Sequence, residues 1–301
     1  MKKILLGTDW WTDCDDCVAL RLLTRFARKG EIELVGVAIN SCMQQSVSSL
    51  DAFLHFDGLN NVPIGIDRNA TDETNTRLTY QFRMSQKAVK YKYNDDAEDG
   101  VRMYRRLLSQ SDEKITIVEI GFHNIMGAVL ESCGDDISDK TGIELFAEKV
   151  EKVYVMGGAY NTTPGHEYNF YYYERTRKGA HILCEKCPVP IVFLGWEVGE
   201  SVKTGGEFLS DGDILKDAMA DFWKHYKSDL QARSSWDPMT VMLAIIGDAE
   251  KAGYKLVYGK NHVDPETGDN TFTEDCNGSH AYVVKLHPDS FYSNMINEII
   301  K

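Results

Sequence analysis

Short apolar segments rich in β-branched residues alternate along this chain with longer segments of helical periodicity. The apolar segments 3–8, 34–40, 115–121, 153–156 and 191–194 have the length and composition of strands. After Asp15, apolar residues recur on one helix face, and the segments 97–108, 124–130, 215–226 and 238–246 are similar. Alternating strands and helices form βαβ units. The sequence therefore predicts an α/β fold, in which helices on both faces cover a mainly parallel sheet.

Polar residues follow the predicted strands, at the edge where sheets of this kind bind ligands. An acidic cluster follows the first strand, Asn40 ends the second, and residues 121–124 and 156–158 follow two later strands. No internal repeat and no linker rich in Pro, Gly or Ser divides the chain. We therefore expect a single domain over residues 1–301, with an insertion or lid in the polar, aromatic stretch 69–99.

The charge and hydropathy of the chain restrict its partners. Lys and Arg number 33 against 46 Asp and Glu, and the net charge of −13 disfavours nucleic acid and anionic membranes. No apolar run approaches the roughly 20 residues that span a bilayer. No secretory signal is visible, so we expect a cytoplasmic protein. The sequence leaves the oligomeric state open, with a homo-oligomer among the alternatives.

Seven cysteines are an odd and low number for this length, which favours free thiols in a reducing compartment. Two C-x-x-C pairs, Cys14/Cys17 and Cys184/Cys187, together match the ligand set of a zinc site. However, Cys17 lies on the apolar face of a predicted helix, and Cys187 precedes a proline. We therefore favour structural roles for both pairs.

The loop after the first predicted strand concentrates negative charge. Within eight positions it carries Asp9, Asp13, Asp15 and Asp16, with Trp10 and Trp11 after the first of them. Helix capping accounts for Asp13 as the cap, and for Asp15 and Asp16 near the positive end of the helix dipole. Capping gives Asp9 no role, whereas a hard divalent cation would bind several carboxylates at once. Oxygen ligands without imidazole or thiolate indicate calcium or magnesium.

A second polar segment follows the glycines at 157 and 158. Asn161, Glu167 and Asn169 lie within nine residues of one another. Asn and Glu suit a polyhydroxylated ligand, because amide and carboxylate groups hydrogen-bond to hydroxyls. An ordinary polar loop with Asn-Thr turn chemistry is the alternative interpretation.

These segments resemble the calcium-dependent inosine-uridine-preferring nucleoside hydrolases. GTDWWTDCDDCVAL at 7–20 fits that family's opening, D-T-D-x-G-x-D-x-D-D-x-x-A-L. MGGA at 156–159, with the polar residues that follow, is similar to its sugar-binding segment, and SWDP at 235–238 to its late aspartate motif. Asn40 and the segments 121–124 and 196–205 are similar too. The resemblance thus covers nearly the whole chain in the same order.

The resemblance implies a role for each matching position. Ca²⁺ would be held by the carboxylates of Asp9, Asp16 and Asp237 and by a backbone carbonyl near His123, and would offset the repulsion within the acidic cluster. Asp9 would also take a proton from the attacking water. The substrate-binding residues would be Asp15 at the ribose 2′-hydroxyl, Asn40 and Asn169 at the ribose diol, Asn161 and Glu167 at the 5′-hydroxyl, and Met156 beside them.

Several positions depart from the family pattern. Gly7 replaces its first aspartate, Trp11 stands where glycine is usual, and residues 171–178 lack its Asp-Pro-Glu-Ala-Ala. Trp236 replaces a histidine that many members carry as a candidate acid for the leaving base, so Trp236 is a candidate substrate-binding residue instead. Together with Trp10 or Trp11 it would stack on a purine, unless these rings fill the core. His123 and His166 are alternative acids.

We therefore expect an enzyme that uses Ca²⁺ to hydrolyse the N-glycosidic bond of a ribonucleoside or related riboside, giving ribose and free base. Direct attack by water predicts inversion at the anomeric carbon. A sugar- or nucleoside-binding protein with weakened catalysis is the alternative that Gly7 and Trp236 favour. A magnesium-dependent phosphatase of the haloacid dehalogenase type would need Asp-x-Asp, and position 11 is Trp.

Overall fold

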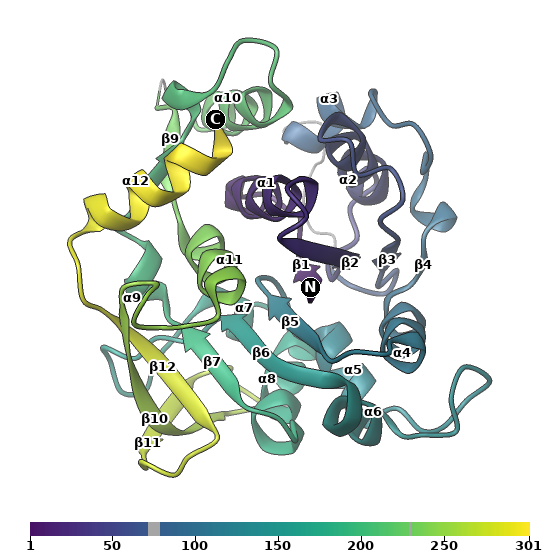
Figure 1. Cartoon of the computed structure of the whole chain (residues 1–301), viewed down its shortest axis with the longest axis vertical. Helices are drawn as coiled ribbons and strands as arrows, with labels where there is room; N and C mark the ends of the chain where they lie inside the picture. Colours follow the sequence, from purple (N-terminus) through teal and green to yellow (C-terminus); the bar gives the residue numbers. More distant parts are fainter. Residues whose placement is uncertain (72–78, 229) are drawn as a thin grey trace.

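The computed structural model describes residues 1–71, 79–228 and 230–301, and its core is one large sheet (Figure 1). The strand order is β11-β10-β12-β7-β6-β5-β1-β2-β3-β4. The strands span, in chain order, β1 (Lys2–Thr8), β2 (Ile32–Ile39), β3 (Ile64–Ile66), β4 (Glu98–Asp99), β5 (Ile115–Glu119), β6 (Val150–Met156), β7 (Ile191–Leu194), β10 (Tyr254–Val263), β11 (Asn270–Glu274) and β12 (His280–Lys285).

Neighbouring strands from β4 through β1 to β12 are parallel, and β10 pairs antiparallel with both β12 and β11 at one edge. The predicted mainly parallel sheet is therefore confirmed, and each of the five predicted strands is present. A separate antiparallel pair joins β8 (Lys203–Gly205) to β9 (Ala232–Ser234).

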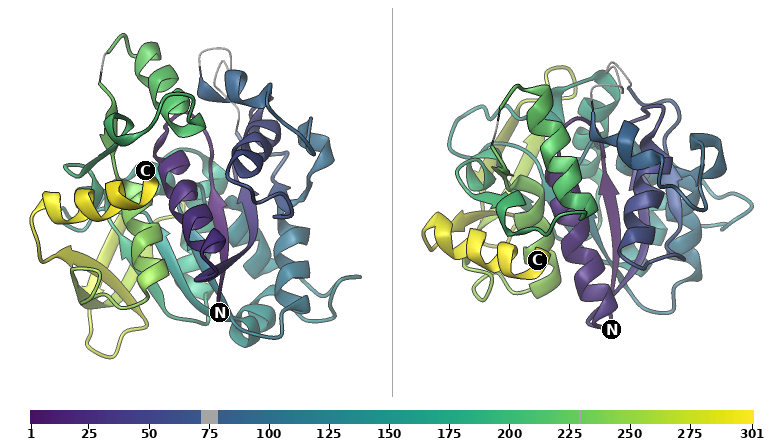
Figure 2. Two further views of the ribbon diagram at one scale, coloured as in Figure 1. Left: turned by 45° about the horizontal axis from the view of Figure 1, so that its top comes forward. Right: turned by 90° about the horizontal axis from the view of Figure 1, so that it is seen from above.

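Helices cover both faces of the sheet (Figures 1 and 2). One face carries α1 (Asp15–Arg28), α2 (Ser46–Phe56), α10 (Ile214–His225), α11 (Trp236–Ile246) and α12 (Asp289–Ile300). The other carries α4 (Gly100–Gln110), α5 (Asn124–Glu131), α6 (Gly142–Lys149) and α8 (Glu174–Lys186). Successive residues of β1 serve the two layers, because Ile4 and Leu6 belong to the first core cluster and Leu5 to the second.

Short helical segments complete the described structure: α3 (Tyr80–Ser85), η2 (Asn94–Asp96), α7 (Tyr168–Tyr171), α9 (Trp196–Gly199) and η3 (Gly206–Phe208). The predicted insertion or lid at 69–99 includes residues 72–78, which lie outside the described residues. Within its described part, Gln81 of α3 is buried and its side-chain amide donates to the carbonyls of Trp10 (2.9 Å) and Trp11. α3 therefore supports the loop after β1, and the single domain with a lid stays a prediction.

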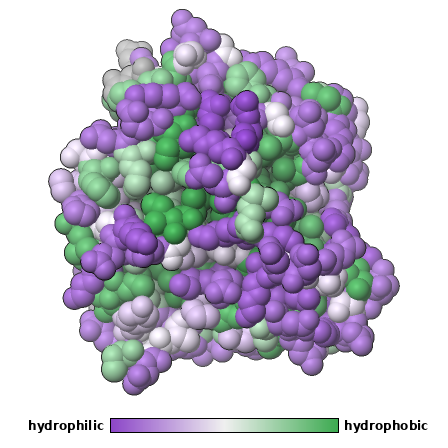
Figure 3. Space-filling view, in the orientation of Figure 1, coloured by the Kyte–Doolittle hydropathy of each residue, from purple (hydrophilic) through white to green (hydrophobic). Residues whose placement is uncertain are grey.

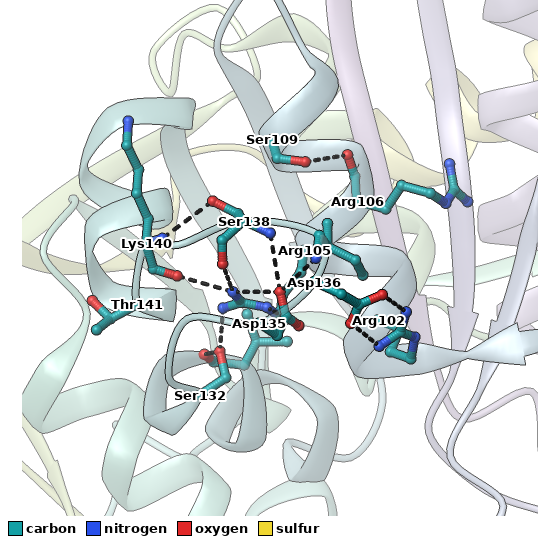
Figure 4. A network of polar contacts seen from close by, with 12 residues as sticks. Arg102, Arg105, Arg106, Ser109, Ser132, Asp135, Asp136, Ser138, Lys140 and Thr141 are labelled. Carbon is teal, nitrogen blue, oxygen red and sulfur yellow. Dashed lines mark hydrogen bonds and ion pairs between the residues drawn. The ribbon is translucent and has the colours of Figure 1, made fainter.

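A buried guanidinium fixes the loop between α5 and α6 (Figure 4). Arg105 of α4 donates to the Asp135 carboxylate at 2.8 and 3.0 Å and to Ser132 Oγ at 2.7 Å. It also donates to the carbonyls of Ser138 and Lys140, at 2.9 Å each. This loop follows a helix, so it lies at the amino ends of the strands, away from the polar strand ends.

The surface and the cysteines raise no conflict with the sequence. Figure 3 shows a mostly hydrophilic face with scattered hydrophobic patches. In the described ranges, no helix has the length and apolar character needed to cross a membrane. Cys14 and Cys17 pack in the first core cluster, whereas Cys184 and Cys187 pack in the second. The cytoplasmic location and the oligomeric state stay predictions.

Candidate active site

The chain changes direction across the sheet between β1 and β5. From β1 it moves to β2 on one side, and β5 later returns to the other side, which creates a crevice at the carboxyl ends of these strands. The loops after the two strands meet at Gly121, where a Cβ atom would overlap the backbone nitrogen of Asp9 and lie 2.6 Å from Asn40 Oδ1. Only glycine allows this approach.

A cavity of about 380 Å³ opens at this crevice. It combines six carboxylates, one guanidinium and five aromatic rings, and its lining residues are Asp9, Trp11, Thr12, Asp13, Asp15, Asp16, Ile120, Met156, Glu167, Tyr168, Asn169, Trp196, Tyr226, Arg233, Trp236 and Asp237. The carboxylates suit a cation and hydroxyl groups, and the rings suit a flat apolar surface. Such a cavity can hold a small ligand with one polar and one aromatic part.

Three buried carboxylates converge on one side of the cavity. Asp15 and Asp16 begin α1, and Asp237 lies in the first turn of α11. One carboxylate oxygen from each lies within 4.8 Å of the other two, and each residue is at most 5% exposed. Burial, followed by repulsion from neighbouring aspartates that include Asp9 and Asp13, raises all three pKa values well above the usual range. Clustered buried oxygens of this kind fit a hard divalent cation, which would offset the repulsion.

Asp9 lines the same cavity but lies outside this group of three. Its Oδ1 accepts from the Trp11 backbone N–H at 3.2 Å, and its carbonyl accepts from Ser41 Oγ at 2.6 Å. Burial and the charges of Asp15 and Asp13 raise the pKa of Asp9 well above its usual range. The expected ligand set of Asp9, Asp16 and Asp237 therefore differs from the group of three found among the described residues, which contains Asp15 in place of Asp9.

The opposite wall comes from the segment after β6. Glu167 accepts from the backbone N–H groups of Asn169 at 2.8 Å and Gly158 at 3.1 Å. Burial raises the pKa of Glu167 to about 7. The Asn169 amide donates to the carbonyls of Ile120 and Met156, at 3.3 Å each. Glu167, Asn169 and Met156 thus line the same cavity as the carboxylates, and their sugar-binding roles stay predictions.

The site and the sequence now point to one family. Residues 4–277 match the sequence model of the inosine-uridine preferring nucleoside hydrolases. The chain belongs to this family. This makes it an enzyme of the nucleoside hydrolase type. No curated protein matches it in a sequence search.

Solved structures show the same fold. The nucleoside hydrolase chain is similar to a plant nucleoside hydrolase, with a TM-score of 0.74 and 17% identity over 99% of this chain and 98% of the other. For an inosine-uridine preferring nucleoside hydrolase from Bacillus anthracis the values are 0.69 and 16%, over 100% and 99%. For an inosine-guanosine nucleoside hydrolase they are 0.70 and 11%, over 99% and 98%.

Two residues expected at the substrate lie outside the cavity of this nucleoside hydrolase. Asn40 is fully buried, where it donates to Glu119 Oε1 at 2.7 Å and accepts from the Phe122 backbone N–H at 2.8 Å. Its amide is committed to holding the loop after β5. Asn161 is exposed to solvent. We therefore assign Asn40 a positioning role and drop Asn161 from the candidate binding residues.

Trp10 is also outside the cavity, and its expected stacking on a base is dropped. The residue is fully buried, and its ring meets Phe53 and Tyr80 edge-on at 5.7 and 5.9 Å. Its indole N–H donates to Ser49 Oγ at 2.9 Å. A positive φ of 45° at Trp10 turns its side chain into the core while its neighbour Trp11 faces the cavity.

Neither candidate histidine lines the cavity. His123 is fully buried, and burial lowers its pKa to about 3, which keeps the ring neutral. Its carbonyl, the expected metal ligand, accepts the Gly127 backbone N–H at 2.9 Å in the first turn of α5. His166 is exposed and lies 2.6 Å from Asp269 Oδ1. The structure therefore supports neither ring as the acid for the leaving base.

At the two substituted positions of the motif, Gly7 and Trp11, other side chains adapt the local packing. A Cβ atom at Gly7 would lie 2.6 Å from Glu119 Cδ, so the buried Glu119 carboxyl fills that space. Burial raises the pKa of Glu119 to about 8. The Trp11 ring packs 4.9 Å from Tyr172 and 5.5 Å from Phe122. Tyr172, directly after α7, and Phe122 thus accommodate the tryptophan that replaces glycine.

Sequence reasoning missed several lining residues. Tyr168 and Trp196 lie within segments noted for other residues, and Tyr226 ends a predicted helix. Arg233 lies four residues before Asp237, in a stretch without a recognisable motif. Its guanidinium pairs with Asp13 at 2.5 Å. This ion pair, rather than helix capping, explains Asp13, and α1 begins without a side-chain cap.

Proposed function

We propose that this nucleoside hydrolase uses Ca²⁺ to hydrolyse the N-glycosidic bond of a ribonucleoside or a closely related riboside, releasing ribose and the free base. The carrying observation is the convergence of buried Asp15, Asp16 and Asp237 within 4.8 Å, in a cavity otherwise walled by polar and aromatic groups. The carboxylate side fits a cation and a sugar, and the aromatic side fits a base.

The carboxylates would bind two different partners, the cation and the ribose hydroxyls. Asp15, Asp16 and Asp237 would hold the cation with Asp9 beside them, and Asp15 would also meet the ribose 2′-hydroxyl. When bound, Ca²⁺ supplies positive charge that offsets the repulsion, orients sugar hydroxyls and makes a nearby water more acidic. Glu167 and Asn169 would hold the remaining ribose hydroxyls through their carboxylate and amide groups.

Asp9 is the proposed general base. Asp9 lines the same cavity as the three clustered carboxylates, so its carboxylate can accept a proton from a water bound there. As the glycosidic bond lengthens, positive charge develops on the ribose ring, and the surrounding carboxylates stabilise that charge. Water then adds to the anomeric carbon while Asp9 takes its proton, and the carbon inverts.

The charge of the cavity selects neutral substrates. Six carboxylates and one guanidinium line it, and that guanidinium is already paired with Asp13. A phosphate on the substrate would add negative charge next to these groups. We therefore infer that nucleosides, rather than nucleotides, are hydrolysed.

The test is a reducing-sugar assay on a panel of nucleosides with Ca²⁺ present. Wild type should release ribose, and Asp9→Asn should lower kcat by about 10²–10⁴-fold, the usual contribution of a general base. Asp211→Asn, at a carboxylate whose side chain is 99% exposed, is the matched control and should retain activity. Full activity of Asp9→Asn would overturn the assignment of the base.

A binding protein with weakened catalysis is the second candidate. It is favoured by the absence of any imidazole among the described lining residues, and by the Trp236 indole N–H, which donates to the Trp196 carbonyl at 2.7 Å and so offers no acid. Calorimetry that detects ribose binding, with no sugar released from any nucleoside, would support this candidate over the enzyme.

A further inference from the structure

Arg233 is the single cationic side chain among the described residues that line the cavity. It extends from β9, and its side chain is 22% exposed. Nε donates to Asp13 Oδ1 at 2.8 Å and Nη2 to Asp13 Oδ2 at 2.5 Å. Its Cζ also lies 4.8 Å from the centre of the Trp236 ring. A bidentate carboxylate and an aromatic face thus fix the plane of this guanidinium at the cavity wall.

The hydrogen bonds that Arg233 makes with described residues leave donors free for a ligand. A guanidinium carries five N–H groups. The bonds from Nε and Nη2 to Asp13, with a bond from Nη1 to Ser234 Oγ at 3.3 Å, engage three of them. Burial opposes the positive charge, but hydrogen bonds and charges from Asp13, followed by Asp15, outweigh it and raise the pKa of Arg233. The group therefore stays charged with two N–H donors beside the cavity.

The cavity creates a need for such a donor. When the glycosidic bond breaks, its electron pair goes to the base nitrogen, and five other lining aspartates and glutamates besides Asp13 would repel that negative charge. No imidazole lines the described cavity, and the Trp236 N–H is already bonded to Trp196. Arg233 is the one cationic side chain among the described lining residues, so it can compensate the charge.

We propose that Arg233 donates hydrogen bonds to the departing base and stabilises its negative charge, an inference that rests on the proposed function. The C1′–N bond breaks with its electron pair on the base, and the water oxygen bonds to C1′ while its proton goes to Asp9. The base, held as an anion by the guanidinium, then takes a proton from solvent and leaves neutral. Arg233 acts by charge and gives up no proton, because its pKa is far above that of the base.

Two substrates with different leaving groups test this role. Inosine loses a base that needs help to depart, whereas 4-nitrophenyl β-ribofuranoside loses a phenolate that departs unaided. Arg233→Gln should lower kcat/KM for inosine by about 100-fold or more, the usual effect of removing one donor from developing charge. For the aryl riboside the loss should be smaller than about 5-fold, because its leaving group does not need the donor.

Asp13→Asn is the matched control, because it breaks the same ion pair but keeps the guanidinium. It should change kcat/KM for both substrates by a similar, smaller factor. Arg233→Lys supplies a second variant that keeps the charge, and it should retain part of the inosine activity. Retention of aryl riboside hydrolysis shows that each variant is folded around its site.

The outcomes separate the two proposals. Selective loss on inosine in Arg233→Gln supports the role of Arg233. If Arg233→Gln loses activity on both substrates, the Arg233→Lys variant is the deciding measurement. If Arg233→Lys also loses both activities in parallel, Arg233 is only a structural partner of Asp13. That result overturns this inference but leaves the proposed function standing. Wild-type protein that hydrolyses neither substrate with Ca²⁺ overturns the proposed function, and this inference with it.

Discussion

Replacing Asp237 by Asn should stabilise the protein without Ca²⁺ and remove its stabilisation by Ca²⁺. Asp237 is 5% exposed and lies within 4.8 Å of both Asp15 and Asp16, oxygen to oxygen. Without a cation, the folded protein must either hold three neighbouring negative charges or bind protons. Asparagine has nearly the same shape and removes one of these charges, but it is a weaker ligand for a divalent cation.

The distances between the three carboxylates give the size of the expected stabilisation. At an effective dielectric constant of about 20, two unit charges 4.8 Å apart repel by about 3.5 kcal/mol, so the two pairs involving Asp237 total about 7 kcal/mol. Protonation of the cluster relieves much of this repulsion, because burial and repulsion raise all three pKa values. The charge at the N-terminus of α11 also contributes about 0.3–1 kcal/mol of favourable dipole interaction, which asparagine loses. A net gain of about 1–3 kcal/mol remains.

The pH dependence has a definite sign. The folded pKa values lie above the ordinary value of 3.8, so these carboxyls contribute stability at pH values below about 4, and that contribution is lost as pH rises through the folded values. The advantage of Asp237→Asn should therefore be larger at pH 8 than at pH 5. It should also be absent from the exposed control Asp211→Asn.

Thermal melting in EDTA and in Ca²⁺ measures both effects. In EDTA at pH 8 the variant should melt a few degrees above wild type, since 1 kcal/mol shifts the midpoint of a chain this long by about 1.6 °C. With Ca²⁺ at about 1,000 times its dissociation constant, wild type should gain about 4.1 kcal/mol and the variant much less, so their order reverses. If Ca²⁺ stabilises both proteins equally, or the variant melts lower in EDTA, the three carboxylates do not form the cation site.

Three further outcomes follow from single contacts. Gly7→Ala should lower the free energy of unfolding, measured in urea, by about 1–3 kcal/mol, because the new Cβ would overlap the Glu119 carboxyl. This cost should be smaller in a Glu119→Ala background. Equal costs in both backgrounds would contradict the contact. Burial raises the pKa of Glu167 from its ordinary 4.5 to about 7, so the metal-free protein should lose about 3 kcal/mol from this group as pH rises from 4 to 8. Glu167→Gln should remove that part of the pH dependence of denaturation, and an unchanged slope would refute it. Inosine 5′-monophosphate should have a kcat/KM at least about 100-fold below that of inosine, because like charges cost several kcal/mol, and comparable turnover of the two would refute the charge argument.

The sequence predicted those parts of the fold whose strands are buried on both faces. β7 is a continuous apolar run, and in β1 and β5 every residue after Lys3 is buried, which is the pattern of a parallel sheet covered by helices. The antiparallel edge of β10, β11 and β12 was not predicted, because its exposed positions are polar, as at Lys255 and Lys260. β3 and β8 have three residues each, too few to show a periodicity.

Site residues were predictable where one motif carries them. Asp15 and Asp16 lie in the acidic loop, and Glu167 and Asn169 share one segment, so local sequence placed them together. Arg233 reaches the cavity only because the β8–β9 pair brings it opposite Asp13, a contact across 220 positions that no local pattern contains. Trp10 and Trp11 are adjacent and chemically alike, and only the backbone turn at Trp10 separates a core residue from a cavity residue.

In the sequence, Gly7 and Trp11 are single departures from the family pattern. In the structure, each of them contacts a side chain that compensates for the substitution. Glu119 of β5 places its carboxyl in the space beside Gly7, and Tyr172, directly after α7, packs against the Trp11 ring. Asp16 is fixed by two hydrogen bonds: its Oδ1 accepts from Thr8 Oγ1 and from the Trp10 backbone N–H, the latter at 3.2 Å. The carboxylates of the acidic loop are therefore held together by contacts with residues outside the family motif. This explains why the spacing of the motif predicted the cluster although single positions of the motif are substituted.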